Sequence, residues 1–129
     1  MYKVEADGEV VAIVINKSFS YDGIKFFTPN DYSQQLGYMK RKAGYEIPLH
    51  YHNHIPRAVS LTQEVLFIKS GKVVVELYSS NRLKLKDVIL EEGDVILLAA
   101  GGHGFRFLEE SEIIEVKQGP YCDNDKTRF

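Results

Sequence analysis

Cysteine is almost absent from this sequence, and a strong net charge and long apolar runs are absent altogether. The single cysteine, Cys122, cannot form an internal disulfide and would be an unpaired thiol in an oxidising compartment, so we expect a cytoplasmic protein. A net charge of −2 lacks the positive field of a nucleic-acid-binding domain. No run of about 18 apolar residues occurs, and Met1–Gly8 lacks an apolar core, so we expect neither a membrane span nor a signal peptide.

Helical patterns are scarce too, since no apolar period of helical type extends over ten residues and only Pro29–Gln35 suits a short helical turn. Short runs rich in Val, Ile, Phe and Tyr alternate instead with turn residues such as Asp22-Gly23 and Glu92-Gly93. The expected strands are Glu9–Ile15, Ile24–Phe27, Leu36–Lys42, Ile47–His52, Ala58–Leu61, Glu64–Lys69, Val73–Tyr78, Leu83–Leu90, Val95–Leu98, Gly104–Leu108 and Ile113–Lys117.

This spacing of strands predicts an all-β sandwich or barrel made of one domain over residues 1–129. The first 35 residues are expected to add strands that flank the barrel. The last nine residues, Tyr121–Phe129, are polar and are expected to form a tail or an arm exchanged with another copy. Arg106 must point away from its neighbours Phe105 and Phe107, because side chains alternate along a strand; the sequence leaves open which set faces the core.

Histidine is concentrated in the run His50-Tyr51-His52-Asn53-His54. On a strand, His50 and His52 share one face and stand about 7 Å apart at the backbone, since a strand rises roughly 3.3 Å per residue. Two such rings can share a metal ion, or they can simply be two solvated histidines. The spacing alone leaves both interpretations open.

Two further residues strengthen the metal interpretation. Glu64 begins a strongly apolar run, where a carboxylate must stay at the rim or find a partner. His103 lies among glycines, so little backbone bulk surrounds it. Three imidazoles and one carboxylate suit one divalent transition metal, which can be Zn, Fe, Mn, Ni or Co. The predicted ligands are His50, His52, Glu64 and His103.

These residues resemble the two sequence motifs of the cupin superfamily. Gly44, five residues and then His50-Tyr51-His52 match the front of the first motif, and Glu64 followed after six residues by Gly71 matches its back. The stretch from Gly93 to His103 resembles the second motif.

The resemblance implies a jelly-roll barrel with its core over residues 36–118, and it places the family's metal ligands on the same four residues. A loop of eleven residues separates His52 from Glu64 and leaves His54 and Gln63 as alternative ligands.

Within the superfamily, the chain is similar to small single-domain cupins of polysaccharide and sugar-nucleotide biosynthesis. This similarity, carried by Thr62–Leu66 and Val116–Tyr121, implies a homodimer and a small, polar, carbohydrate-like ligand. Tyr38 and Lys40 would line the cavity if their face of the strand turns inward. Arg57 in the mouth loop would suit a carboxylate or phosphate, or would be solvated.

Three functions follow from this interpretation, and none has identified catalytic residues. The first is a metal-dependent enzyme of isomerase or dioxygenase type. The second is a non-catalytic module that senses a small metabolite. The third is a metal-free cupin that resembles sugar epimerases, which pair a histidine with a carboxylate as the base; the sequence shows no such partner for His103 or His50.

Overall fold

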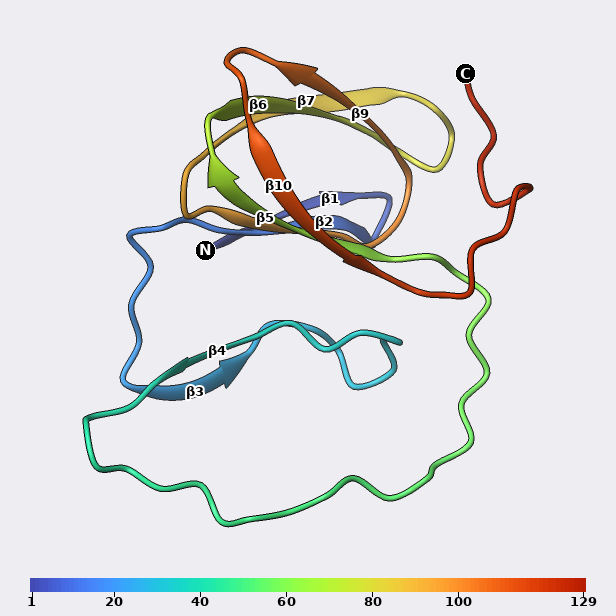
Figure 1. The fold of residues 1–129 in the computed structure, drawn as a ribbon. Coiled ribbons are helices and arrows are strands. Elements are labelled where there is room, and N and C mark those ends of the chain that lie inside the picture. The colour runs from blue at the N-terminus through green and yellow to red at the C-terminus, as the bar shows by residue number, and fades with distance from the viewer. The chain divides into compact units, whose positions relative to one another are not determined.

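The computed structural model describes residues 1–129, whose contacts divide them into two compact units. The first unit comprises Met1–Phe19 and Leu61–Phe129, and the second comprises Ser20–Ser60. Every regular element in either unit is a β-strand, which confirms the expected all-β class (Figure 1). No helix in the structure has the length and apolar character needed to cross a membrane.

The first unit is built from two antiparallel sheets. The larger has five strands in the order β1-β2-β8-β5-β10, and the smaller has three in the order β7-β6-β9. Neither sheet closes on itself, so a closed jelly-roll barrel remains a prediction. The bounds in the larger sheet are β1 Tyr2–Ala6, β2 Glu9–Ile15, β5 Glu64–Ser70, β8 Val95–Leu98 and β10 Glu112–Lys117, and in the smaller sheet β6 Lys72–Tyr78, β7 Lys84–Glu91 and β9 Gly102–Phe107.

Aliphatic side chains from both sheets form the core of this unit. Because side chains alternate along a strand, residues two apart, such as Leu66 and Ile68 or Val75 and Leu77, reach the same cluster. Each fully buried Val, Leu or Ile contributes roughly 1.5–3 kcal/mol. The cluster includes Ala12 and Val14 of β2, Leu66 and Ile68 of β5, Val75 and Leu77 of β6, Val88 and Leu90 of β7, and Ile96 and Leu98 of β8.

A buried carboxylate fixes the turn that leads into β8. Asp94 accepts hydrogen bonds from the backbone N–H of Glu91 and from that of Lys17, each 2.8 Å long. The second bond joins this turn to the residues that follow β2. β8 is thereby held between β2 and β5, where the register pairs Leu98 with both Ala12 and Glu64.

The second unit contains one hairpin, formed by β3 Gly23–Phe26 and β4 Gly37–Lys40. The connection between the two strands is held by Gln35, whose side chain accepts a hydrogen bond from Thr28 Oγ1 and donates one to the Pro29 carbonyl, both 2.8 Å long. Tyr32 N–H also donates to the Pro29 carbonyl at 3.2 Å. The expected helical turn is therefore a single hydrogen-bonded turn without a helix.

Residues 41–60, called the histidine segment from here on, contain no strand, and every one of them is exposed. The expected strands over Ile47–His52 and Ala58–Leu61 are therefore wrong for this structure. A strand is defined by a hydrogen-bonded neighbour, and none runs alongside this segment. Pro48 and Pro56 also lack the N–H that a central strand requires.

The C-terminal residues that follow β10 form no strand and contact other residues of the first unit. The ring of Phe129 contacts that of Tyr78 edge to face, with centroids 5.4 Å apart, and Arg82 lies 5.5 Å from the same ring. Thr62 Oγ1 donates a 2.7 Å hydrogen bond to Asp125. In the single chain, Tyr121–Phe129 thus packs as a tail on its own chain, and an exchange with another copy stays a prediction.

Candidate active site

A pocket of about 240 Å³ opens in the first unit where an edge strand of one sheet faces an edge strand of the other. β9 is the edge of the smaller sheet and β10 is an edge of the larger one. The floor and walls are apolar except for a few ionisable groups. The lining residues are Glu64, Leu66, His103, Phe105, Phe107, Ile113, Glu115 and Lys126.

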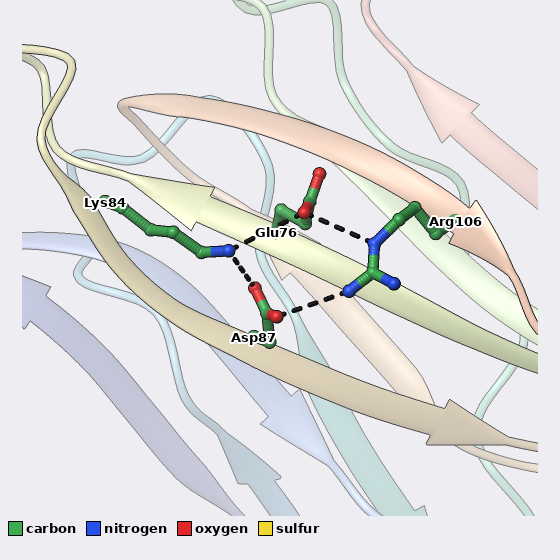
Figure 2. A network of polar contacts seen from close by, with 4 residues as sticks. All are labelled: Glu76, Lys84, Asp87 and Arg106. Atoms are coloured by element: carbon green, nitrogen blue, oxygen red, sulfur yellow. Dashed lines mark hydrogen bonds and ion pairs between the residues drawn. The ribbon is translucent and has the colours of Figure 1, made fainter.

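Alternation along β9 decides which of its side chains reach the pocket. His103 and both phenylalanines line it, so Arg106 points to the other face of the sheet. There Arg106 lies 3.3 Å from Glu76 and 3.3 Å from Asp87 (Figure 2). Lys84 bridges the same two carboxylates, at 2.9 Å from Asp87 and 3.6 Å from Glu76. The network joins all three strands of the smaller sheet. The sequence left open which set of β9 side chains faces inward, and the structure shows that the two phenylalanines do and Arg106 does not.

The central feature of the pocket is a contact between Glu64 and His103. The Nε2 atom of His103 lies 3.3 Å from Oε2 of Glu64, so the contact joins β5 of the larger sheet to β9 of the smaller one. Glu64 is buried, whereas the imidazole remains partly open to solvent. Lys117 Nζ lies 3.9 Å from the other carboxylate oxygen.

Electrostatics keep Glu64 ionised at neutral pH. The hydrogen bond from His103 lowers the pKa of Glu64, and this effect outweighs burial, which acts in the opposite direction. The charges of His103, Lys117 and Lys126 lower the pKa of Glu64 further. A carboxylate that accepts from Nε2 fixes the imidazole orientation, as the orienting acid does in hydrolytic triads.

The structure thus supplies the carboxylate partner for His103 that the sequence did not reveal. A partly exposed imidazole oriented by a buried carboxylate can accept a proton from a bound molecule and return it. The same pair can also form hydrogen bonds to a ligand without chemistry. Both possibilities require the molecule to enter the pocket beside β9.

His50 and His52 form a second pair, located in the histidine segment. Their ring centroids lie 5.4 Å apart with the planes at 82°, and Nδ1 of His50 lies 2.8 Å from the Pro48 carbonyl. Both residues are exposed. The four predicted metal ligands therefore form two separate pairs of neighbouring side chains, one pair in each unit of the chain.

A resident transition metal takes at least three protein ligands. Nowhere in the structure do three or more His, Cys, Asp or Glu side chains gather in a way that could hold an ion. Neither pair alone therefore fits such a metal, and a centre with all four ligands stays a prediction.

The remaining predicted residues are placed as follows. Gln63 is buried, its side chain donates to the Ala99 carbonyl at 3.3 Å, and its backbone N–H donates to Gln118. Lys40 pairs with Asp22 at 3.2 Å within the second unit. The half-buried Tyr38 lies on β4, and His54 and Arg57 lie exposed in the histidine segment.

Sequence reasoning missed several residues of the pocket. Phe105 and Phe107 share the face of His103, so their alternation with it was a usable signal. Ile113 and Glu115 are two residues apart on β10 and follow the same rule. Lys126 belongs to the tail, which has no periodic pattern, so no local signal pointed to it.

Comparison of the chain with family models, with curated proteins and with solved structures finds no match. The cupin resemblance therefore rests on the two sequence motifs.

Proposed function

We propose that this chain is a cupin-type protein that binds a small, polar, carbohydrate-like metabolite and moves a proton on it with the Glu64–His103 pair. The observation that supports this proposal is the 3.3 Å contact between these two side chains in the wall of a pocket. The chemistry that fits is of isomerase type, in which one base removes a proton and delivers it to a neighbouring atom.

The other pocket residues suit a ligand with both apolar and polar faces. Phe105 and Phe107 offer aromatic surface for the C–H face of a sugar ring. Glu115 and Lys126 offer a hydrogen-bond acceptor and a cation for hydroxyl or acidic groups. Pockets that bind small molecules commonly combine apolar walls with a few polar groups in this way.

In the proposed reaction, His103 removes a proton from a carbon next to a carbonyl group. The electron pair of that C–H bond moves into the carbon framework to form an enediol or enolate, and the imidazole becomes imidazolium. The anionic Glu64 stabilises the imidazolium through its short contact. The imidazolium then delivers this proton to the former carbonyl carbon of the enediol, while the hydroxyl proton of the adjacent carbon passes to the former carbonyl oxygen. This regenerates the neutral imidazole and moves the carbonyl group by one carbon, so the step needs no external oxidant or reductant.

The test begins with a thermal-shift screen of sugar phosphates and nucleotide sugars. Ligands that bind are incubated with the protein in deuterated buffer, and carbon-bound protons are followed by NMR. We expect proton–deuterium exchange next to a carbonyl, and a loss of about 10²–10⁴-fold in its rate for His103→Asn and Glu64→Gln. Glu92→Gln changes an exposed carboxylate outside the pocket and serves as the control.

Exchange that persists in both pocket variants would contradict the proposal. A ligand that binds, with no exchange at any position in the wild-type protein, would instead favour a binding or sensing module.

A second candidate is a metal-dependent cupin, which rests on the four ligands that the sequence predicts. The structure places them in two pairs, Glu64 with His103 and His50 with His52. With a metal ion bound, the four residues would hold it and it would supply Lewis acidity. Elemental analysis of untagged protein tests this: near-stoichiometric metal, lost in His50→Ala/His52→Ala, supports it, and no metal after reconstitution rejects it.

A further inference from the structure

The tail, Tyr121–Phe129, is held on the first unit by side chains at two points. Asp125 accepts a 2.7 Å hydrogen bond from Thr62, and the ring of Phe129 packs edge to face on Tyr78, beside the turn that joins β6 to β7 (Figure 1). Every residue of the tail is exposed, and no backbone hydrogen bond joins the tail to a strand. A segment held by so few contacts opens locally at a low cost in free energy.

The second of these contacts lies next to the pocket. The ring of Phe129 packs over Gly102 of β9 so closely that a Cβ atom there would lie 2.6 Å from Cζ and 2.8 Å from Cε1 of the ring. Any residue larger than glycine at this position must therefore displace the ring. Gly102 directly precedes His103, so the docked tail and the proposed base share one short stretch of β9.

Between its two points of attachment, the tail carries a charge into the pocket. Lys126 lines the pocket and lies near enough to lower the pKa of Glu64, but it forms no ion pair. The two carboxylates that line the pocket do have a cationic partner, because Lys117 lies 3.9 Å from Glu64 and 3.3 Å from Glu115. The ammonium group of Lys126 is thus the lining charge that stays available to a ligand, and it complements an anion.

We infer that the tail is a strap that closes over a bound ligand, and that its Lys126 is a specificity-determining residue that binds an acidic group of the ligand, a carboxylate or a phosphate. With the strap docked, the pocket keeps a volume of about 240 Å³, so strap and ligand have room together. A ligand that contacts Lys126 only in the docked state stabilises docking, and docking raises the affinity for the ligand by the same factor. The inference rests on the proposed function for the place where the ligand binds.

A tryptophan at the end of the strap reports docking before any ligand is added. The chain contains no tryptophan, so Phe129→Trp introduces a single emitter whose quenching by acrylamide rises when the strap opens. In this background, Gly102→Ala pushes the ring away. We expect it to shift the equilibrium toward the open strap by about 2–10-fold, the range that the loss of one aromatic contact corresponds to.

A second glycine on the same strand supplies the matched control. A Cβ atom on Gly104 would come no closer than 3.4 Å to Oε2 of Glu76, so Gly104→Ala should leave the quenching unchanged. Thr62→Val opens the other point of attachment without touching β9 and should raise the quenching as Gly102→Ala does. Quenching that neither Gly102→Ala nor Thr62→Val raises above the Gly104→Ala level would overturn the docked strap.

Three probes of similar ring structure then test the acidic group. D-glucose, D-glucuronate and D-glucose 6-phosphate are added to the Phe129→Trp protein at constant ionic strength. We expect an acidic probe to reduce the quenching and neutral glucose to leave it unchanged. A response to glucuronate alone identifies a carboxylate as the recognised group, and a response to the phosphate alone identifies a phosphate.

Removal of the charge on Lys126 should abolish this selectivity. Lys126→Gln should weaken binding of the acidic probe by about tenfold or more, as expected for the loss of a charged hydrogen bond. Lys3→Gln changes an exposed lysine on β1 and should bind as the parent does. An equal response to glucose, a response that survives in Lys126→Gln, or no response to either acidic probe would overturn the inference. A strap that closes on an acidic probe without any proton exchange would support this inference and contradict only the proposed chemistry.

Discussion

At the scale of single residues, the site depends on one buried carboxylate. The contact of Glu64 with the imidazole of His103 offsets the free-energy cost of burying its charge. Glu64 occupies a buried position at the start of β5, and His103 lies 3.3 Å away on β9. A buried charge without a partner is strongly destabilising, whereas a hydrogen-bonded one is tolerated. The contact therefore serves the fold as well as any reaction, and its removal should be visible in stability measurements.

The stability of the wild-type protein should fall in acid partly through Glu64. Because the pKa of Glu64 is lowered in the folded state, its ionisation stabilises the fold above the unfolded pKa of about 4.3 and this contribution is lost as pH falls through the folded value. We expect the difference in unfolding free energy between wild type and Glu64→Gln to shrink as pH falls from 6 to 3. Urea titrations at each pH measure this difference, with Glu92→Gln as a control that should parallel the wild type.

Two glycines with similar positive φ angles should respond differently to substitution by alanine. Gly8 has a φ of +78° and an added Cβ would meet nothing within 4 Å, whereas Gly101 has a φ of +69° and its Cβ would collide with the Tyr78 carbonyl oxygen. We expect Gly8→Ala to cost about 1–2 kcal/mol from the left-handed conformation alone, and Gly101→Ala to cost more. Thermal unfolding compares the two, and equal losses would show that the turn before β9 relaxes freely.

The sequence identified both members of the pocket pair but not their contact. Glu64 and His103 are separated by 38 intervening residues, and only the packing of two sheets brings them together. Local pattern could not locate Lys126 either, because the tail owes its position to contacts such as that between Phe129 and Tyr78.

At the scale of elements, alternation predicted most strands within one or two residues. β2 and β8 have the bounds that the sequence indicated. β1 was missed, although Asp7 and Gly8 both have positive φ and form the type of turn that Asp-Gly favours in hairpins. The histidine segment was overpredicted for the opposite reason: its pattern suits a strand, but a pattern does not supply the neighbour that a strand needs.

β6 allows a comparison between its two faces. Leu77 is fully buried in the core, and Glu76 faces the network with Arg106. We expect Leu77→Ala to cost about 2–5 kcal/mol, because it leaves a cavity. Arg106→Ala should cost less than about 1 kcal/mol, and added salt should reduce that loss because the ion pairs are exposed. Chemical denaturation at low and high salt measures both, and a salt-independent loss of several kcal/mol for Arg106→Ala would contradict this account.

At the scale of the whole molecule, the sequence could not predict whether the sheets close into a barrel. The cupin resemblance implied a closed barrel, whereas the described chain has two open sheets and one separate hairpin. A sheet closes into a barrel only when its two edge strands pair with each other. Such pairing joins strands that are far apart in the sequence, so it leaves no local pattern.

Proteolysis should report the exposure of the histidine segment. Arg57 and the basic residues that follow β4 are exposed and lie outside any strand, so trypsin should cut there first. We expect cleavage within the strands of the first unit to be slower, because their backbone is hydrogen-bonded in sheets. Mass spectrometry of the fragments identifies the sites, and cleavage within these strands before the histidine segment is cut would contradict this expectation.

The contact between Glu64 and His103 also bears on the balance between stability and function. It crosses from one sheet to the other. Two well-packed aliphatic side chains in its place would often match or exceed the stability that a buried ion pair provides. An aliphatic pair would leave this wall of the pocket without a group that can accept or donate a proton. A polar pair at a position where an apolar pair would be at least as stable is what selection on a site, rather than on stability alone, is expected to leave.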